Sequence, residues 1–188
     1  MKIYHYTKGL HLKSIFNDGF IATEQKRNLN MEAPFFSDLV WLTESKTVPV
    51  TSLPLISSVP STNLNNRARI KDMQTDYSTI SKIIGGFWRF GFDSTRSKCE
   101  KWFFSNARNE AYKLPGMLRM DQIATKVGDN IRDFWVSEKD IALETFTLEL
   151  LNVEANEWMY VEPTSIRFSP TNDGRGYVIH VDAFQLAA

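Results

Sequence analysis

A histidine near the amino terminus is the residue of this sequence whose neighbours best suit ligand binding or catalysis. Residues 3–7 read Ile-Tyr-His-Tyr-Thr and predict a short strand with His5 at its centre. A neutral imidazole there can hydrogen-bond the hydroxyl groups of a ligand, and an aromatic side chain can clamp a flat ring. A histidine in a strand is also commonly a structural residue with satisfied hydrogen bonds, so its interpretation depends on the surrounding pattern.

Several familiar catalytic and cofactor motifs are absent from the sequence. It contains no Gly-x-x-x-x-Gly-Lys-Ser/Thr loop, no Gly-x-Gly-x-x-Gly turn and no Gly-x-Ser-x-Gly elbow. The three histidines, at positions 5, 11 and 180, are scattered, so no metal site is indicated. Cys99 is the only cysteine, which excludes an internal disulfide and favours a reducing compartment. We interpret it as a buried or idle thiol.

The composition is that of an ordinary globular protein. Of the 188 residues 43% are hydrophobic and 23% charged, and the 22 basic and 22 acidic residues cancel. No general electrostatic attraction to nucleic acid or to an anionic membrane is therefore indicated. No apolar stretch approaches the length of a membrane span, and we expect a cytoplasmic protein of a bacterium or a phage-infected cell, without a membrane partner.

The elements that must position His5 indicate an α+β fold, because predicted helices lie early and strands late without regular alternation. Thr7 is expected to cap a helix that ends at Gly19. A second strand is predicted at 40–43 and a third at 87–92, with helices at about 102–112 and 117–127. The last third predicts strands at 133–138, 145–151, 157–161, 166–168 and 177–181.

We expect one domain over residues 1–188, because no repeat or defensible boundary is found. Residues 45–76 are rich in Pro, Ser, Thr and Asn and predict a long loop. Such a loop inside a domain is usually a functional lid or an ordered excursion over the surface.

The order of these features resembles the start of the ADP-ribosyltransferase-like family, in its diphtheria-toxin-like and DNA-modifying branches, and also of the tRNA 2′-phosphotransferases. The shared features are the strand with His5, the helix that ends at Gly19 and the strand 40–43. The likeness covers about residues 2–45. It implies split antiparallel sheets flanked by helices, NAD as the substrate and no metal.

The resemblance also implies a set of site residues. His5 would contact the NAD ribose, with Tyr6 and Thr7 beside it. Trp41 and Thr43 on the second strand would line the nicotinamide pocket, although Trp41 is expected in the core unless it stacks on the ligand.

An acid on a late strand would complete the site. Cleavage of the nicotinamide–ribose bond passes through an oxocarbenium-like state, which a preoriented carboxylate stabilises. Glu138 and Asp133, on the strand 133–138, are the two candidates, with Glu138 ahead because glutamate is the usual acid of the family. Glu157 is a third candidate, and each of the three can instead be an exposed carboxylate at a strand end. No Glu-x-Glu pair is present, which argues against arginine as the acceptor.

The function implied by the resemblance is mono-ADP-ribosylation of a host protein or a nucleic acid, in a toxin or phage-defence setting. The alternative is a non-catalytic inhibitor or immunity factor, which would dock through the Pro-rich segment 46–62 and its aromatic residues. A third possibility, transfer of a 2′-phosphate from RNA to NAD, calls for several basic residues in one cleft, and the first strand offers one histidine.

Overall fold

Strands account for most of the regular structure. The computed structural model of the chain describes residues 1–23, 39–49, 81–82, 84–95, 97–102, 122, 124–174, 176–182 and 184–186. The strands in these ranges are β1 (Lys2–Lys8), β2 (Phe20–Ile21), β3 (Val40–Thr43), β4 (Phe87–Asp93), β5 (Glu100–Lys101), β6 (Phe134–Ser137), β7 (Ile141–Ala142), β8 (Thr147–Asn152), β9 (Glu157–Val161), β10 (Ile166–Pro170), β11 (Tyr177–Val181) and β12 (Phe184–Leu186). The helices that lie wholly within these ranges are α1 (Gly9–Asp18) and the 3₁₀ turns η4 (Ile131–Asp133) and η5 (Pro163–Ser165). Residues 81–82 and 124–127 are also helical.

The broad α+β prediction is confirmed. Every predicted strand is present, and the predicted bounds of β3, β9 and β11 coincide with the observed ones. The sequence pattern does not predict the short strands β2, β5, β7 and β12. The predicted helix 102–112, most of the helix 117–127 and most of the loop 45–76 lie outside the described residues.

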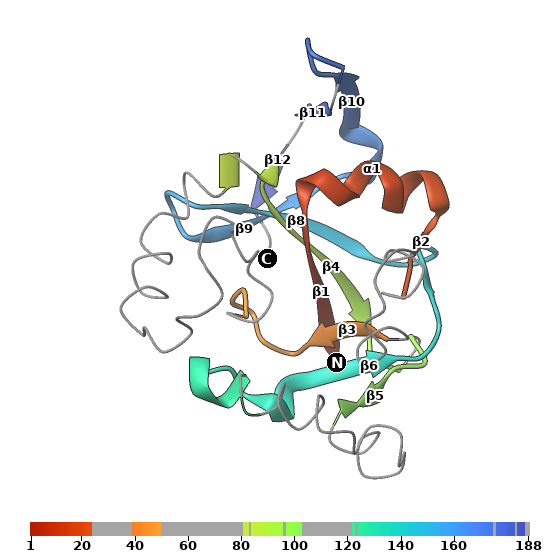
Figure 1. Ribbon diagram of the computed structural model, residues 1–188, viewed down its shortest axis with the longest axis vertical. Helices are drawn as coiled ribbons and strands as arrows, with labels where there is room; N and C mark the ends of the chain where they lie inside the picture. The colour runs from red at the N-terminus through yellow and green to blue at the C-terminus, as the bar shows by residue number, and fades with distance from the viewer. Residues whose placement is uncertain are drawn as a thin grey trace.

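The main sheet is built around β1. Its eight strands follow the order β12-β9-β8-β4-β1-β3-β6-β5 (Figure 1). All neighbouring pairs of these strands are antiparallel. Two smaller sheets join β10 with β11 and β2 with β7.

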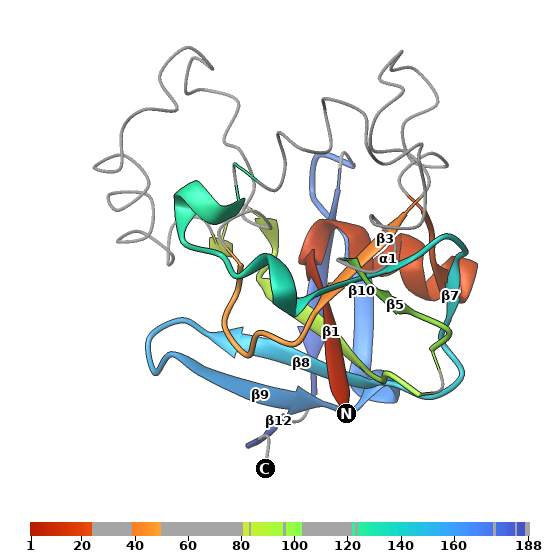
Figure 2. The same ribbon diagram turned by 90° about the horizontal axis from the view of Figure 1, so that it is seen from below.

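The pairing between β1 and β3 is the shortest in the main sheet. β1 pairs with β4 over its whole length, but with β3 only at Tyr4↔Thr43. In Figure 1, β3 and β6 cross the lower part of β1 at a steep angle, whereas β4 runs alongside it. Figure 2 shows the β8–β9 hairpin projecting past β1 on the side away from β7. The strands β3, β6 and β5 therefore form a second part of the sheet, which is joined to the first at one position; we call this place the junction.

Alternation along β1 gives the sheet two different faces. Cα partners in antiparallel strands share a face, so His5 lies with Phe90, and Tyr6 lies with Arg89 on the other side. The His5 face is the hydrophobic one, and α1 covers it with Leu12 and Ile15. The main cluster of buried side chains there is Ile3, Leu12, Ile15, Ile21, Val40, Leu42, Trp88, Phe90, Phe92, Cys99, Ile141, Leu148 and Val161.

The carboxyl end of α1 agrees with the prediction and its amino end does not. Gly19 closes the helix with a φ of 74° and donates its N–H to Ile15 O. The predicted cap by Thr7 is wrong, because β1 continues to Lys8, which is the N-cap and makes no side-chain cap bond.

A close crossing of two backbones fixes where α1 begins. Gly9 N donates to Gly86 O, and a Cβ on Gly9 would clash with Gly85 O. Only glycine at position 9 permits this approach. The β10–β11 hairpin lies beside the helix (Figure 1), and Tyr177 of β11 donates its hydroxyl to Gly9 O at 2.8 Å.

Candidate functional site

His5 connects the two parts of the main sheet. Its ring is half-buried, and Nδ1 lies 2.9 Å from the backbone oxygen of Trp41 on β3. Because a carbonyl oxygen can only accept, Nδ1 carries the proton in this bond. The other ring nitrogen, Nε2, is buried. The bond adds a second link to Tyr4↔Thr43, the one backbone pair of the junction. The predicted histidine therefore lies where the two parts of the sheet meet.

The two residues after His5 lie on different faces. Tyr6 is on the face opposite His5, where its hydroxyl donates to Ser45 O at 2.7 Å. Burial, opposed in part by the hydrogen bond and charge of Arg89, raises the pKa of Tyr6 to about 12. Thr7 returns to the His5 face, and its Oγ1 is buried without a hydrogen-bond partner in the described part of the chain. Of the predicted residues on β1, only His5 and Thr7 can thus face one ligand.

Both predicted residues of β3 make contacts within the fold. The Trp41 ring packs against Trp102, with ring centres 4.9 Å apart, and edge-on against Phe134. Thr43 is 3% exposed, and its Oγ1 accepts the N–H of Ser45 at 3.0 Å. Trp41 is therefore a packing residue, and Thr43 fixes the turn that follows the strand.

The two favoured acids lie at opposite ends of β6, and neither is in the strand. Asp133 ends the turn η4, and its carboxylate accepts from Asn130 Nδ2 at 2.9 Å. Glu138 is exposed and follows the last residue of β6. The predicted strand 133–138 is thus one residue too long at each end, because a 3₁₀ turn precedes it and a bend follows it.

Asp133 lies at the end of β6 that is level with the junction. The Cα partners Tyr4↔Thr43 and Thr43↔Phe134 form a row across β1, β3 and β6. Asp133 precedes Phe134 in the chain, and its backbone oxygen accepts the N–H of Glu44 at 2.9 Å. The other two candidates are farther away: Glu138 is at the far end of β6, and Glu157 is exposed on β9, which β8 and β4 separate from β1.

Glu44 is an acid near the junction that the sequence pattern does not single out. It directly follows β3, and its carboxylate accepts from Trp135 Nε1 at 2.7 Å and forms an ion pair with Lys101. Burial alone would raise the pKa of Glu44, but the hydrogen bonds from Lys101 and Trp135 and the charge of Lys101 outweigh it and lower the pKa. The carboxylate is therefore held ionised and in a fixed orientation.

A buried ion pair lies on the face opposite His5. Arg89 Nε donates to Glu149 Oε2 at 2.6 Å, and Nη1 donates to Lys46 O at 2.7 Å. The guanidinium carbon lies 4.1 Å from the centre of the Tyr4 ring and 4.2 Å from that of Trp158. The cation is thus enclosed by a carboxylate, a carbonyl oxygen and two aromatic rings, an arrangement that leaves little room for a ligand.

The sequence indicates one of the two residues of this ion pair. Arg89 interrupts the otherwise apolar run of β4, so it needs a partner. Glu149 carries no such signal, because it alternates with Leu148 and Leu150 as an exposed residue would. It is nevertheless 3% exposed, because Arg89 is its Cα partner on β4.

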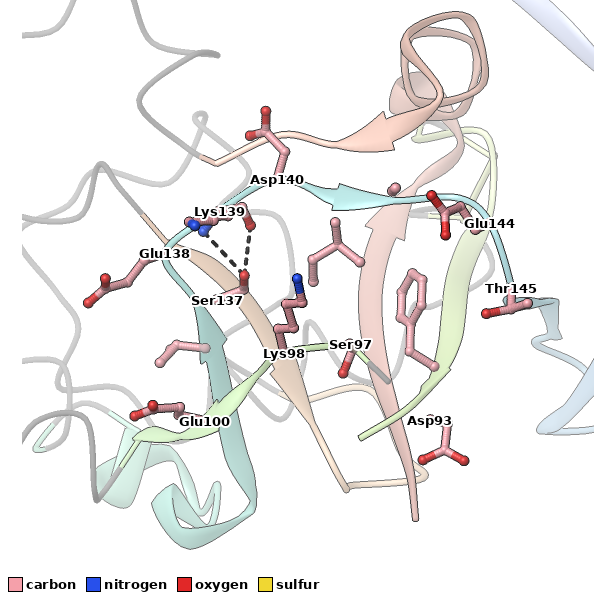
Figure 3. A pocket seen from close by; sticks show the side chains of 14 residues that line it. Asp93, Ser97, Lys98, Glu100, Ser137, Glu138, Lys139, Asp140, Glu144 and Thr145 are labelled. Atoms are coloured by element: carbon pink, nitrogen blue, oxygen red, sulfur yellow. Dashed lines mark hydrogen bonds between the residues drawn. The ribbon is translucent and has the colours of Figure 1, made fainter. Parts of the chain in front are cut away.

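A pocket of about 510 Å³ lies between the β4–β5 connection and the β6–β7 connection (Figure 3). Glu138 is the one predicted site residue on its wall. Figure 3 shows the Lys98 ammonium near the middle of the pocket, with carboxylates such as Glu144 around it. Its size is within the range of small-molecule sites.

Comparison with known proteins gives no match to a protein family, a curated protein or a solved structure. In the ranges that the structure describes, no group of three or more His, Cys, Asp and Glu side chains is arranged to hold a metal ion. None of the described helices is long and apolar enough to cross a membrane. The thiol of Cys99 is buried as expected, and this burial raises its pKa. Its Sγ donates to the backbone oxygen of Ser97 at 3.3 Å.

Proposed function

We propose that the chain is a mono-ADP-ribosyltransferase that transfers ADP-ribose from NAD to a macromolecule. The observation that carries the proposal is the row Tyr4–Thr43–Phe134 across β1, β3 and β6. It makes neighbours of the strand with His5, the strand β3 and the strand that follows Asp133. This order of strands supports the family resemblance, while Trp41 and Thr43 make contacts within the fold and are not part of the proposed site.

The spacing of the strands suits a ligand between the histidine and the acid. β1 and β6 are two strand spacings apart, which is roughly 10 Å. That separation is too long for a hydrogen bond between His5 and Asp133, and it is about the size of a nucleoside. In this arrangement a ribose hydroxyl donates a hydrogen bond to His5 Nε2, and the Asp133 carboxylate stabilises positive charge on the sugar.

The reaction breaks one bond and forms one. The bond between C1′ of the ribose and the nicotinamide nitrogen breaks, and its electron pair leaves with nicotinamide, which becomes neutral. An oxygen or nitrogen nucleophile of the acceptor donates its lone pair to C1′ and releases its proton to solvent. The negative charge of Asp133 favours the oxocarbenium-like state over the bound substrate, and so it accelerates the step.

Release of nicotinamide from NAD by the purified protein, with cell extract as the source of acceptor, tests this function. The decisive variant is His5→Asn, because the asparagine amide can replace Nδ1 as the donor to Trp41 O but offers nothing in place of Nε2. We expect a folded protein with at least about a tenfold lower rate. The matched control is His180→Asn on the exposed β11, where Nε2 contacts Ser169 Oγ, and it should keep the rate. No release by the wild type in any extract, or equal losses in both variants, would contradict the proposal.

A further inference from the structure

The pocket of Figure 3 contains a lysine whose ammonium group makes no contact that stabilises the described part of the fold. Lys98 has no ion pair or hydrogen bond with the part of the chain that the structure describes, although several carboxylates line the same pocket. Its backbone is left-handed, with a φ of 50°, which is uncommon for lysine and directs the side chain from the turn into the pocket. The Lys98 side chain is exposed at this open pocket, and an ammonium group without a partner there can bind an anionic group of a ligand.

Hydroxyl groups accompany this ammonium. Ser97 Oγ is buried and has no hydrogen-bond partner among the described residues, and it lines the pocket directly before Lys98. The Ser137 hydroxyl lies on the opposite wall and donates to Lys139 O at 2.7 Å.

The charges of the residues that line the pocket restrict the kind of ligand that it can bind. Five lining residues are acidic (Asp93, Glu100, Glu138, Asp140 and Glu144) and two are basic, Lys98 and Lys139. This excess of negative charge opposes anionic ligands in general and a polyanion such as a nucleic acid strand most strongly, so the pocket favours at most one anionic group, beside Lys98. A ligand with one anionic group for Lys98 and several hydroxyl groups for the surrounding carboxylates suits the wall, since carboxylates accept hydrogen bonds from ribose hydroxyls in nucleotide sites.

We infer that this pocket binds a ribose-phosphate group, with the phosphate on the Lys98 ammonium and the ribose hydroxyls on the carboxylates of the rim. The pocket is lined from both faces of the sheet, because Phe92 is the Cα partner of Ile3 on the His5 face, whereas Val136 is the partner of Trp41 on the other face. The assignment of the ligand to NAD rests on the proposed function. Both halves of NAD contain a ribose phosphate, so either the nicotinamide or the adenine half can be the source.

Calorimetric titration with nicotinamide mononucleotide and, separately, with AMP tests the inference and distinguishes the two sources. Inorganic phosphate and adenosine are the control ligands. We expect saturable binding of at least one mononucleotide to the wild type. In Lys98→Gln the affinity should fall roughly 10- to 100-fold, the usual loss for a charged hydrogen bond. Lys98→Gly should lose as much, and glycine tolerates the φ of 50° without strain, so a shared loss excludes a backbone effect.

The matched control is Lys82→Gln, which removes an exposed lysine outside the pocket and should leave the affinity unchanged. The inference is overturned if neither mononucleotide binds, or if both bind to Lys98→Gln and Lys98→Gly as they do to the wild type. It is also overturned if polyanionic RNA binds the pocket more tightly than the mononucleotides. None of these binding results bears on whether the protein releases nicotinamide. Conversely, a protein that releases no nicotinamide but binds a mononucleotide through Lys98 would contradict only the transferase function.

Discussion

Arg89 and Glu149 stand directly opposite each other on β4 and β8 and form an ion pair that solvent scarcely reaches. Arg89 Nε donates to Glu149 Oε2 at 2.6 Å, and both side chains are at most 6% exposed. Lys2 Nζ approaches the same carboxylate from the surface at 3.2 Å. The pair therefore joins the central strands of the sheet, and either charge would be strongly unfavourable without the other.

Removal of one partner should destabilise the protein severely. We expect Arg89→Met to lower the free energy of unfolding by about 3–5 kcal/mol, because Glu149 then keeps a buried charge without its main partner. Urea denaturation followed by fluorescence measures the change. The double variant Arg89→Met/Glu149→Leu should cost less than the single one, since no buried charge remains. The control is Arg167→Met, whose ion pair with Asp182 is exposed and should contribute at most about 1 kcal/mol. Equal losses in Arg89→Met and Arg167→Met would contradict the role of burial.

The same cluster should protect the backbone at Lys46 from proteolysis. Lys46 O accepts from Arg89 Nη1 at 2.7 Å and from Trp158 Nε1 at 3.0 Å, and it belongs to the peptide bond that trypsin cleaves. Trp158→Phe keeps a ring beside Arg89 and removes the second of these bonds. Loss of one hydrogen bond, about 1 kcal/mol, should increase the rate of cleavage after Lys46 roughly fivefold. Mass spectrometry of timed digests measures that rate. Tyr160→Phe, on the same strand, removes a surface bond to Glu162 and should change nothing, so an equal acceleration in that variant would contradict the prediction.

Glu44 should contribute to the pH dependence of stability on the acid side. Its pKa is lowered in the folded state relative to the ordinary value of 4.5, so its stabilising effect is present above that value and is lost as the pH falls through the folded-state pKa. Glu44→Gln cannot titrate, so the difference in stability between the wild type and this variant should shrink as the pH is lowered from 7 towards 3. Urea denaturation across this range measures the difference. A constant difference would show that Lys101 and Trp135 do not favour the ionised carboxylate.

The sequence predicted the strands well because runs rich in aromatic and branched aliphatic residues are bounded by turn residues. Leu148 and Leu150 in β8 also stand two positions apart, and the turns at Gly19 and Gly174 have positive φ, which glycine supplies. The short strands β2 and β7 escaped prediction because each has only two residues, too few for a pattern. They pair only because the chain brings Phe20 beside Ala142.

The site was less predictable because its geometry depends on pairings far apart in the chain. The position of His5 in a strand follows from its neighbours, but the bond to Trp41 O depends on the junction with β3. Glu149 illustrates the same limit, since alternation alone places it in solvent and only Arg89, 60 residues earlier, explains its burial. Lys98 carries no signal in the sequence, because its role in the pocket depends on a left-handed turn and on the distant wall beyond β6.

The proposed function favours Asp133 over Glu138, the reverse of the order expected from the sequence, and kinetics can test that choice. Asp133 lies beside the row that crosses the junction, whereas Glu138 lies at the far end of β6 on the wall of the pocket. We therefore expect Asp133→Asn to lower kcat for nicotinamide release by about a hundredfold or more, because the charge that stabilises the oxocarbenium-like state is lost. The hydrogen bond from Asn130 Nδ2 is retained by the amide oxygen, so the fold should be preserved.

Glu138→Gln should act mainly on KM for NAD, because a carboxylate of the pocket wall contributes to binding before and during the reaction alike. Steady-state measurement of nicotinamide release over a range of NAD concentrations separates the two constants for each variant. Glu157→Gln, on the exposed start of β9, is the matched control and should resemble the wild type. A hundredfold loss of kcat in Glu138→Gln together with normal turnover in Asp133→Asn would restore the order expected from the sequence. It would also require the ribose to lie at the pocket end of β6, away from the junction.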